Sequence, residues 1–401
     1  MQEYKIVKDD IYWIGALDYD IRVFDIVMET KYGTTYNAYL VKGSSKTVLF
    51  ETVKEKFFDE YLKRLTALTS VEDIDYIIVN HTEPDHAGSI AKLLQMNPEI
   101  TLIGTSIALK YLAGITNMTF KSKVAKEGEV LDLGGKTVQF ISVPNLHWPD
   151  SMYSYIPEDK ALFTCDSFGC HYCSDAVFND CIDEDFTDAY KYYFDAIMSP
   201  FKPFVLKALQ KIAPLDIETI CPGHGPVLRM DIPKYLKMYQ DWSLPHKVDT
   251  NYIVIPYVSA YGYTKLLAEK IKEGIESEGL VAKMYDLVEE DKEEVLAQMQ
   301  DAIGLLFGSP TILSDALPPI WELLYSLNPI IHKGKYAGSF GSYGWSGEAV
   351  TFIDERLKQL RFKVPMTGLK IVFNPSEDQQ EEALAFGKYF AAFIKTNHPI
   401  L

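Results

Sequence analysis

The sequence has no apolar run close to the roughly 20 residues that a transmembrane helix needs, because Gly, Pro or Lys interrupts its longest apolar stretches. Its first residues, Met-Gln-Glu-Tyr-Lys-Ile, contain no basic segment followed by an apolar one, which is the pattern of a secretory signal. These two absences predict a cytoplasmic protein with no membrane partner.

Basic residues are also scarce. Lys and Arg number 39 against 56 Asp and Glu, which gives a formal net charge of −17 at pH 7. A protein that binds nucleic acid needs clustered basic side chains to replace the counterions of the phosphate backbone. The charge balance therefore predicts that the protein has no nucleic-acid partner.

Cysteine is rare, and the five cysteines lie in one stretch, from Cys165 to Cys221. An odd number confined to one part of a long chain is not the pattern of a disulfide framework. Cys170 and Cys173 enclose His171 at a metal-like spacing, but no second pair completes a four-thiolate site. We interpret these thiols as small packed side chains, with a redox or structural role as the alternative.

What is present indicates a folded chain of two domains. Its 401 residues are 47% hydrophobic and 24% charged, which is typical of globular proteins, and the length exceeds one ordinary core. A polar segment at 245–250 follows the last helical pattern of the first part, so we place the domains at 1–249 and 250–401. Strands and helices are expected in mixed order in the first domain, which favours a layered α/β sandwich.

Runs of β-branched and aromatic residues predict strands in the first domain at 36–41, 47–52, 74–79, 101–104, 137–143, 161–164 and 217–220. Apolar residues at helical spacing predict helices at 54–68, through Ile90, Leu93 and Leu94, and at 185–200, 205–212 and 232–244.

The segment 80–88 follows a strand-like run and contains His81, Glu83, Asp85 and His86. Alternate side chains of an extended segment point to different sides, so four such residues cannot all bind one ion without strain. The spacing favours a site for two metal ions. The alternative is a polar loop rich in helix-capping residues.

Three later loops provide further candidate ligands. His147, Asp166 and His224 each follow a predicted strand, beside Gly or Pro in two of the three loops. Active sites are commonly built from loops at one edge of a sheet, where a rigid scaffold directs the side chains. Each residue alone is more typical of an ordinary hydrogen-bonded polar group, but the set as a whole favours a metal site.

The order His-x-Glu-x-Asp-His, then His, then Asp, then Gly-His-Gly resembles the metallo-β-lactamase superfamily. Its zinc hydrolases usually have His where this chain has Glu83, and a Glu there resembles the flavodiiron proteins, a likeness that extends over nearly the whole chain. A carboxylate in place of an imidazole favours a harder, redox-active ion over zinc. The resemblance implies a metallo-β-lactamase-like αββα sandwich followed by a flavodoxin-like domain.

The resemblance also implies roles for the candidate residues. One iron would take His81, Glu83 and His147, and the other Asp85, His86 and His224. Asp166 would bridge the two irons, so that the ligand set is complete without His171. Tyr193 lies where the family often has a tyrosine near the irons, and its phenol could donate a proton or a hydrogen bond. Trp148 is a candidate for a wall that faces the flavin.

Strands and helices alternate regularly in the last 150 or so residues, as a doubly wound parallel sheet requires. We expect strands at 252–257, 281–285, 302–307, 336–340 and 370–373, and helices at 264–276, 292–299, 319–327, 348–360 and 378–394. Five such strands fit a flavodoxin-like fold, whose ligands bind beyond the carboxyl ends of the strands.

Three loops at these strand ends are candidates for binding flavin mononucleotide (FMN). The first opens a helix and lacks both the Walker and the Gly-x-Gly-x-x-Gly spacings, so a phosphate monoester is favoured over a dinucleotide, and the loop resembles the phosphate loop of flavodoxins. Tyr343 and Trp345 offer flat faces to an isoalloxazine ring. The alternative is that the loops are ordinary turns. The candidate residues are Ser259, Ala260, Tyr261, Gly262, Tyr263, Thr264, Ser309, Pro310, Thr311, Ile312, Leu313, Ser342, Tyr343, Gly344, Trp345, Ser346 and Gly347.

A flavin and a diiron centre in one chain indicate a reductase for a small acceptor. In the family that the chain resembles, the acceptors are dioxygen, reduced to water, and nitric oxide, reduced to nitrous oxide. No cysteine follows Cys221, so no rubredoxin-like domain is expected, and the resemblance implies a separate donor, either rubredoxin or a reduced deazaflavin. It also implies a head-to-tail homodimer or homotetramer.

Two other functions fit parts of the sequence. One is a zinc-dependent hydrolase with a flavodoxin appendage, which would have His at the position of Glu83. The other is a flavodoxin-type electron carrier or redox sensor with a vestigial metal domain, which would tolerate the loss of ligands. The choice between dioxygen and nitric oxide stays open.

Overall fold

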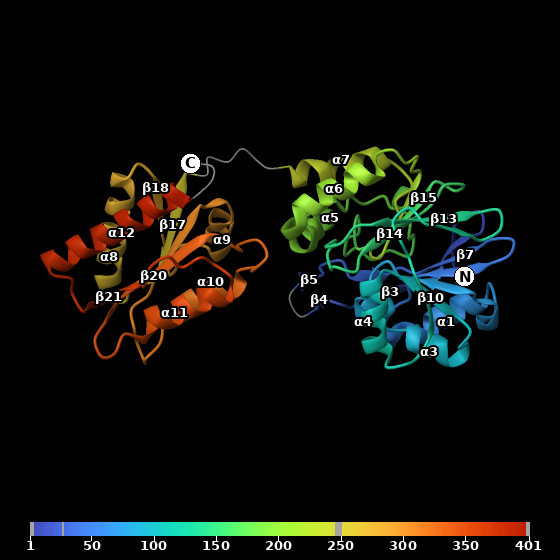
Figure 1. Ribbon diagram of the computed structural model, residues 1–401, viewed down its shortest axis with the longest axis horizontal. Helices are drawn as coiled ribbons and strands as arrows, with labels where there is room; N and C mark the ends of the chain where they lie inside the picture. Colours follow the sequence, from blue (N-terminus) through green and yellow to red (C-terminus); the bar gives the residue numbers. More distant parts are fainter. Residues whose placement is uncertain (1–3, 26–27, 245–250, 398–401) are drawn as a thin grey trace. The chain divides into compact units, whose positions relative to one another are not determined.

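The computed structural model describes residues 4–25, 28–244 and 251–397 (Figure 1). The chain divides into two compact units, Met1–Leu244 and Pro245–Leu401. The boundary predicted between 249 and 250 lies outside the described residues. In the part of the chain that is described, no helix combines the length and the apolar character that crossing a membrane requires.

The first unit contains two large sheets. The seven-stranded sheet has the order β1-β2-β7-β8-β9-β10-β11, and the five-stranded sheet the order β12-β13-β14-β15-β16. The first sheet consists of β1 (Lys5–Lys8), β2 (Ile11–Trp13), β7 (Tyr39–Lys42), β8 (Thr47–Phe50), β9 (Tyr76–Ile78), β10 (Thr101–Gly104) and β11 (Lys121–Val124). The second consists of β12 (Val130–Asp132), β13 (Thr137–Ser142), β14 (Met152–Ile156), β15 (Ala161–Cys165) and β16 (Thr219–Pro222). Two short pairs complete the unit: β3 (Ala16–Asp18) with β6 (Thr34–Tyr36), and β4 (Val23–Phe24) with β5 (Met28–Glu29).

Alternating side chains hold these layers together. Val48 and Ile78 belong to a core with Phe163 and Cys221 of the other sheet, which fills the space between the two sheets. The residues between them along each strand face outward and pack under helices, a second core that contains Leu49 on the first sheet. Helices therefore cover both outer faces, and the predicted αββα sandwich is confirmed (Figure 1). The helices are α1 (Phe58–Thr66), α2 (Pro84–Ala87), α3 (Ile90–Met96), α4 (Ser106–Thr116), α5 (Thr187–Tyr193), α6 (Lys202–Ile212) and α7 (Ile232–Ser243).

Several predicted boundaries in this unit were wrong. The strand expected at 36–41 is two strands, β6 and β7, because Asn37 between them leaves the strand pairing: its backbone N–H donates to the Gly223 carbonyl, and its side-chain amide donates to the Pro222 and Gly225 carbonyls. The helix expected at 185–200 is α5 followed by a π-helical turn and a 3-10 turn. The strand expected at 217–220 lies two residues later, at β16. Helix α4 and strand β14 were not predicted.

The second unit is one parallel sheet of five strands in the order β18-β17-β19-β20-β21. Its strands are β17 (Tyr252–Tyr257), β18 (Val281–Asp286), β19 (Gly304–Gly308), β20 (Tyr336–Tyr343) and β21 (Leu369–Val372). Helices α8 (Tyr263–Ser277) and α12 (Glu377–Asn397) cover one face, and α9 (Lys292–Asp301), α10 (Pro318–Ser326) and α11 (Glu348–Gln359) cover the other. The strand order reverses beside β17, which is the switch point where ligands of such sheets bind.

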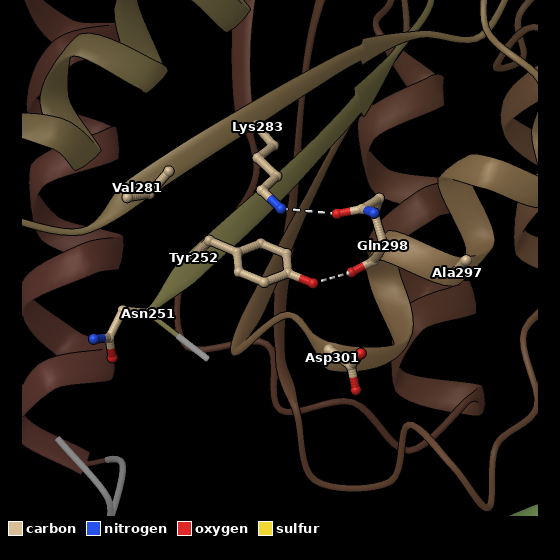
Figure 2. Close-up of a pocket in the computed structure, with 7 residues that line it drawn as sticks. All are labelled: Asn251, Tyr252, Val281, Lys283, Ala297, Gln298 and Asp301. Atoms are coloured by element: carbon tan, nitrogen blue, oxygen red, sulfur yellow. Dashed lines mark hydrogen bonds between the residues drawn. The ribbon is translucent and has the colours of Figure 1, made fainter. Parts of the chain in front are cut away.

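A recess of about 340 Å³ lies at the amino ends of β17 and β18, away from the carboxyl ends of the strands where ligands of such sheets bind (Figure 2). The Lys283 ammonium donates to the Gln298 side chain at 2.8 Å and lies over the Tyr252 ring, and the Tyr252 hydroxyl donates to the Gln298 carbonyl at 2.9 Å. These polar groups bind one another, and their contacts hold α9 against the sheet.

Two glycines allow α8 and α12 to approach closely. A Cβ at Gly387 would lie 2.1 Å from the Ile271 carbonyl oxygen, and one at Gly274 would lie 2.1 Å from that of Leu384. We expect Gly387→Val to lower the free energy of unfolding of this unit by roughly 1–3 kcal/mol, because the helices must separate. The control is Gly114→Ala in α4, where an added Cβ meets nothing within 4 Å and should raise stability by about 0.5–1 kcal/mol. Thermal unfolding of both variants checks these two expectations. Equal shifts of the unfolding temperature in the two variants would contradict the close packing of α8 and α12.

Candidate metal centre

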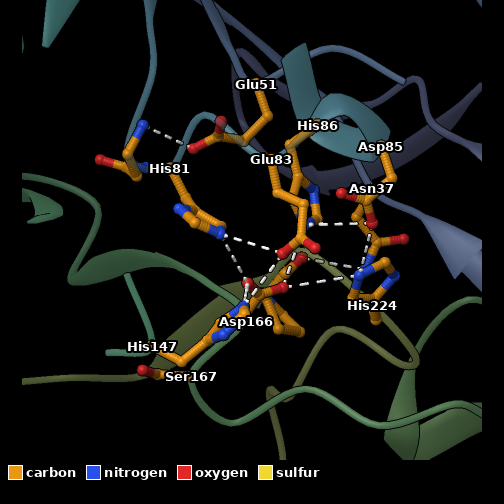
Figure 3. Close-up of polar contacts among 12 residues, drawn as sticks. Asn37, Glu51, His81, Glu83, Asp85, His86, His147, Asp166, Ser167 and His224 are labelled. Atoms are coloured by element: carbon orange, nitrogen blue, oxygen red, sulfur yellow. Dashed lines mark hydrogen bonds and ion pairs between the residues drawn. The ribbon is translucent and has the colours of Figure 1, made fainter. Parts of the chain in front are cut away.

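Seven side chains from four segments that follow strands meet at one edge of the two sheets of the first unit (Figure 3). His81 and Glu83 lie between β9 and α2, whereas Asp85 and His86 lie on α2 itself. The remaining three follow the carboxyl ends of β13, β15 and β16: His147, Asp166 and His224. The structure therefore brings together all seven residues that the sequence predicted for a metal site.

One set of donors is His81, Glu83, His147 and Asp166, whose ligand atoms all lie within 4.8 Å of one another. The Glu83 Oε2 atom is 3.2 Å from His81 Nε2 and 3.0 Å from His147 Nε2. The Asp166 Oδ2 atom is 3.4 Å and 3.2 Å from the same two nitrogens. Two imidazoles and two carboxylates therefore converge on one point.

The other set is Asp85, His86 and His224, whose ligand atoms also lie within 4.8 Å of one another. The Asp85 Oδ2 atom is 3.1 Å from His224 Nε2 and 3.5 Å from His86 Nε2. Here Asp166 contributes its other oxygen: Oδ1 is 3.0 Å from His86 Nε2 and 3.5 Å from His224 Nε2. Each carboxylate oxygen of Asp166 thus faces one set, which is the arrangement of a bridging ligand.

The electrostatics of these residues fit a bound cation. Burial disfavours the imidazolium form of His86, but Asp85 and Asp166 raise its pKa to about 9. Burial likewise opposes ionisation of Asp166, yet His86 and His147 hold its pKa well below the usual range. Both oxygens of Asp85 and Oδ2 of Asp166 are buried without a hydrogen-bond partner among the described residues. A metal ion would satisfy these carboxylate oxygens, and a mixture of carboxylates and imidazoles suits iron.

Asp150, which was not among the residues predicted from the sequence, contacts His81 at the ring nitrogen that faces away from the other donors. Its Oδ2 atom lies 3.3 Å from His81 Nδ1 and accepts hydrogen bonds from the backbone N–H and hydroxyl of Thr82 at 2.9 and 2.8 Å. The Thr35 carbonyl accepts a bond from His224 Nδ1 at 2.6 Å in the same manner. Such partners orient a ligating imidazole and direct its Nε2 atom toward the metal. No pattern in the sequence marks Asp150, because it is an ordinary loop carboxylate three residues after His147.

We expect Asp150→Asn to weaken iron binding by about 10–100-fold, because an amide replaces the ionised acceptor of His81. Competition with a chelator measures the affinity. Asp195→Asn is the matched control, since Asp195 pairs with Lys191 on the surface and should leave iron binding unchanged. Equal affinities of the wild type and Asp150→Asn would show that His81 does not depend on this contact.

Glu51 is a second buried carboxyl group behind the centre (Figure 3). Its Oε1 atom accepts the backbone N–H of Asn80 at 2.8 Å, and burial raises its pKa to about 8. The next residue, Thr52, donates its backbone N–H and its hydroxyl to the His86 carbonyl at 2.8 and 2.6 Å. Together they hold both ends of the segment 80–86. Glu51 was expected in a strand but has a left-handed backbone (φ +58°) that ends β8.

Three other residues named from the sequence lie around the centre. Tyr193 is buried, and its hydroxyl donates to Asp166 Oδ1 at 3.2 Å. Trp148 packs edge-on against His81, with ring centres 5.1 Å apart. His171, which the predicted ligand set excluded, lies outside both donor sets but packs 5.2 Å from the His224 ring. Burial and the neighbouring His224 hold the pKa of His171 well below its usual value.

The seventeen residues predicted to bind FMN follow or end β17, β19 and β20, which are neighbours in the sheet, so they lie at one edge. One part of the prediction was wrong: Ser342 and Tyr343 belong to β20 rather than to a loop, because β21 continues to pair with them. Hydrogen bonds link the segments: the Thr264 and Ser342 hydroxyls are 2.9 Å apart, and the backbone N–H of Thr311 donates to the backbone carbonyl of Ser342 at 2.9 Å.

This edge of the sheet fits a flavin phosphate and ring. Gly262 has a left-handed backbone (φ +85°) that starts the 15-residue helix α8, whose N-terminus attracts an anion. Within its first turn, the Lys265 N–H donates to the Ser259 hydroxyl at 3.2 Å. Tyr261, Leu313 and Trp345 project from the three segments with 80%, 92% and 89% of their surface exposed. Exposed apolar and aromatic groups next to a helix N-terminus are suitable for a ligand with a phosphate and a flat ring.

A metallo-β-lactamase-like sandwich with donors for two metal ions, joined to a flavodoxin-like sheet, defines a redox metalloflavoprotein. Residues 34–225 match the ODP family beta lactamase and residues 255–387 match the flavodoxin family. The flavo-diiron protein FprA2 of Clostridium acetobutylicum is 43% identical over 396 residues, which cover 97% of this chain and 99% of that protein. The chain belongs to the flavodiiron protein family.

Other similar proteins support the same family. The type A flavoprotein of Rhodobacter capsulatus is 38% identical over 393 residues, which cover 96% of this chain and 90% of that protein. Among solved structures, the rubredoxin:oxygen oxidoreductase of Desulfovibrio gigas has a TM-score of 0.70 at 30% identity, covering 98% of this chain and 99% of that one. The Giardia intestinalis flavodiiron protein has a TM-score of 0.68 at 28% identity, covering 99% and 98%. The protein is an oxidoreductase whose cofactors are FMN and a non-haem diiron centre.

Proposed function

We propose that the protein reduces dioxygen to water, nitric oxide to nitrous oxide, or both, at a diiron site fed by FMN, and so detoxifies these gases. The observation that carries the proposal is the position of Asp166, whose two oxygens each face one set of donors. Glu83 adds the carboxylate that favours iron over zinc. The similarity of the whole chain to a protein named rubredoxin:oxygen oxidoreductase supports the same class of reaction.

The proposal assigns roles to the chain's own residues. One iron is held by His81, Glu83 and His147, the other by Asp85, His86 and His224, and Asp166 bridges them. The loops at β17, β19 and β20 hold the FMN. When bound, the two cofactors supply the electron-transfer chemistry, and the residues supply binding, orientation and a water-poor site. Tyr193 donates a hydrogen bond to the bridging carboxylate, which fixes its orientation.

The proposal extends to partners and location. Electrons come from a separate donor in the cytoplasm, either rubredoxin or a reduced deazaflavin. The protein assembles head to tail as a homodimer or homotetramer, so that the FMN of one subunit serves the irons of another. Trp148, packed against His81, then faces the flavin of the neighbouring subunit.

The test is turnover of each gas by anaerobically purified protein that contains iron and flavin, with an excess of a chemical reductant. Electrodes for dioxygen and nitric oxide record consumption, and the ratio of the two rates decides the preference. We expect consumption of at least one gas far beyond the amount of enzyme. Loaded protein that consumes neither gas would overturn the proposal.

A further inference from the structure

Cys165 is a buried cysteine to which the proposed function gives no role. It is a free thiol, and 3% of the residue is exposed. The two hydrophobic cores in the described part of the first unit include Cys170 and Cys221 but not Cys165. Its side chain therefore does not lie in the apolar packing that surrounds the other two buried thiols.

The backbone at Cys165 explains why its side chain leaves the core. Residues two apart on a strand face the same side, so a regular β15 would direct Cys165 into the space between the sheets together with Phe163. Instead, the register shifts between these two residues, where two steps along β15 correspond to one step along β16. Cys165 also has a left-handed backbone (φ +49°). Such features redirect a side chain and are frequent beside functional sites.

The thiol lies at the metal centre. The Cys165 Sγ atom, a ring nitrogen of His86 and a carboxylate oxygen of Asp166 all lie within 4.8 Å of one another. His86 and Asp166 are 0% and 2% exposed, and each has a buried polar atom without a hydrogen-bond partner among the described residues. A sulfur, a nitrogen and an oxygen donor are therefore close enough to hold one ion, which would satisfy buried groups that lack partners.

The loop after β16 holds Cys165 next to His86. The Gly223 N–H donates to the Cys165 carbonyl oxygen at 2.6 Å. A Cβ at Gly223 would lie 2.6 Å from the Cε1 atom of His86 and 3.2 Å from the carbonyl carbon of Cys165, so glycine is what allows the ring and the strand to approach this loop. The backbone that carries the thiol is thus fixed beside His86 by contacts within the protein.

The chemistry of these three donors differs from that of the two sets proposed for iron. Those sets contain only carboxylates and imidazoles, whereas a thiolate favours softer ions. Thiolate, imidazole and carboxylate together are the ligand types that bind Zn²⁺, and Cd²⁺ is a still softer ion of the same charge. The thiolate is the form that binds metal, so the thiol proton leaves to solvent as the sulfur–metal bond forms.

We propose that Cys165, His86 and Asp166 bind a soft divalent cation, of the class of zinc and cadmium, in a site that excludes the second iron. His86 and Asp166 are also ligands proposed for that iron, so an ion bound to Cys165 removes two of its ligands. The cysteine gives the centre a second mode of metal binding, one that blocks gas reduction. Exclusion of the iron rests on the proposed function, whereas the sulfur–metal bond does not.

Cd²⁺ is the probe, because a cadmium–thiolate bond has a charge-transfer absorption in the ultraviolet that nitrogen and oxygen ligands do not give. Full-length protein, freed of metal by a chelator, is titrated with Cd²⁺. We expect a band of about one thiolate per chain, and no band in protein that has first been loaded with iron. Cys165→Ser keeps the size of the side chain and should lose the band, with the unfolding temperature and the iron content unchanged. Cys181→Ser removes an exposed thiol and is the control, which should keep the band.

The thiolate band decides the result. Cadmium bound to the wild type without the band, or a band that persists in Cys165→Ser, would overturn the proposed site and leave the proposed function standing. A band of equal strength in iron-loaded protein would overturn the exclusion of iron. A band in protein that takes up no iron would support the sulfur–metal bond and overturn the proposed function.

The wild type alone gives an answer if Cys165→Ser does not fold. Cys165 is the only cysteine in the donor groups found among the described residues, so a band that iron abolishes belongs to this thiol.

Discussion

Protein with Asp166 replaced by alanine is expected to lose both irons and all gas reduction while its flavin absorbance stays at the wild-type level. Asp166 approaches all four imidazoles of the centre, from 3.0 Å at His86 to 3.5 Å at His224. Removing an outer partner of a ligand costs about 10–100-fold in metal affinity, so removing a ligand shared by two ions should cost more than about 100-fold.

Iron and flavin per chain, measured on the same sample, check this result. Asp216→Ala is the matched control, because Asp216 pairs with Lys160 on the surface and should leave both cofactors in place. Asp166→Ala protein that retains two irons would mean that Asp166 is not a bridging ligand, and the assignment of the two donor sets would be wrong.

Replacing Ser259 with glutamate is expected to have the reciprocal effect, loss of FMN with iron retained. The Ser259 hydroxyl accepts the Lys265 N–H at 3.2 Å, so it lies at the N-terminus of α8 where the phosphate is expected. A carboxylate there is itself favourable for the helix dipole and occupies the place of the phosphate. We therefore expect FMN affinity to fall more than about 100-fold while the unfolding temperature stays the same.

Titration of apoprotein with FMN, followed by flavin fluorescence, gives the affinity. Ser326→Glu, on the exposed end of α10, is the control for an added charge and should bind FMN normally. Unchanged FMN affinity in Ser259→Glu would place the phosphate elsewhere, and the loop after β17 would then be an ordinary turn.

The two variants together test the head-to-tail assembly. Asp166→Ala subunits keep FMN but no iron, and Ser259→Glu subunits keep iron but no FMN. If the FMN of one subunit serves the irons of another, subunits mixed by unfolding and refolding or by coexpression should recover part of the gas reduction. A mixed assembly with no activity would indicate electron transfer within one chain.

The sequence was most informative about the second unit, where strands and helices alternate and the three central strands, β17, β19 and β20, are buried on both faces. That alternation predicted all ten of its strands and helices to within a few residues. The exception is β20, which continues through Ser342 and Tyr343 because β21 pairs with them. Pairing with a partner that is distant in sequence gives no local signal, so the end of a strand is its least predictable part.

In the first unit, the seven donors could be found because metal-binding residue types recur at strand ends. The residues that hold them could not. Asp150 acts on the far nitrogen of His81, Glu51 binds a backbone N–H, and Thr35 contributes only a carbonyl. Asn37 interrupted a predicted strand for the same reason, since its contacts with the loop after β16 are tertiary. Such contacts depend on the fold and leave no periodic pattern in the chain.

The most direct test of the account is the content of iron, zinc and flavin in protein purified without oxygen. The account predicts about two irons and one FMN per chain with little zinc, as expected for a redox enzyme that depends on its cofactors. Zinc in place of iron, in protein that reduces neither dioxygen nor nitric oxide, would contradict it and favour a hydrolase.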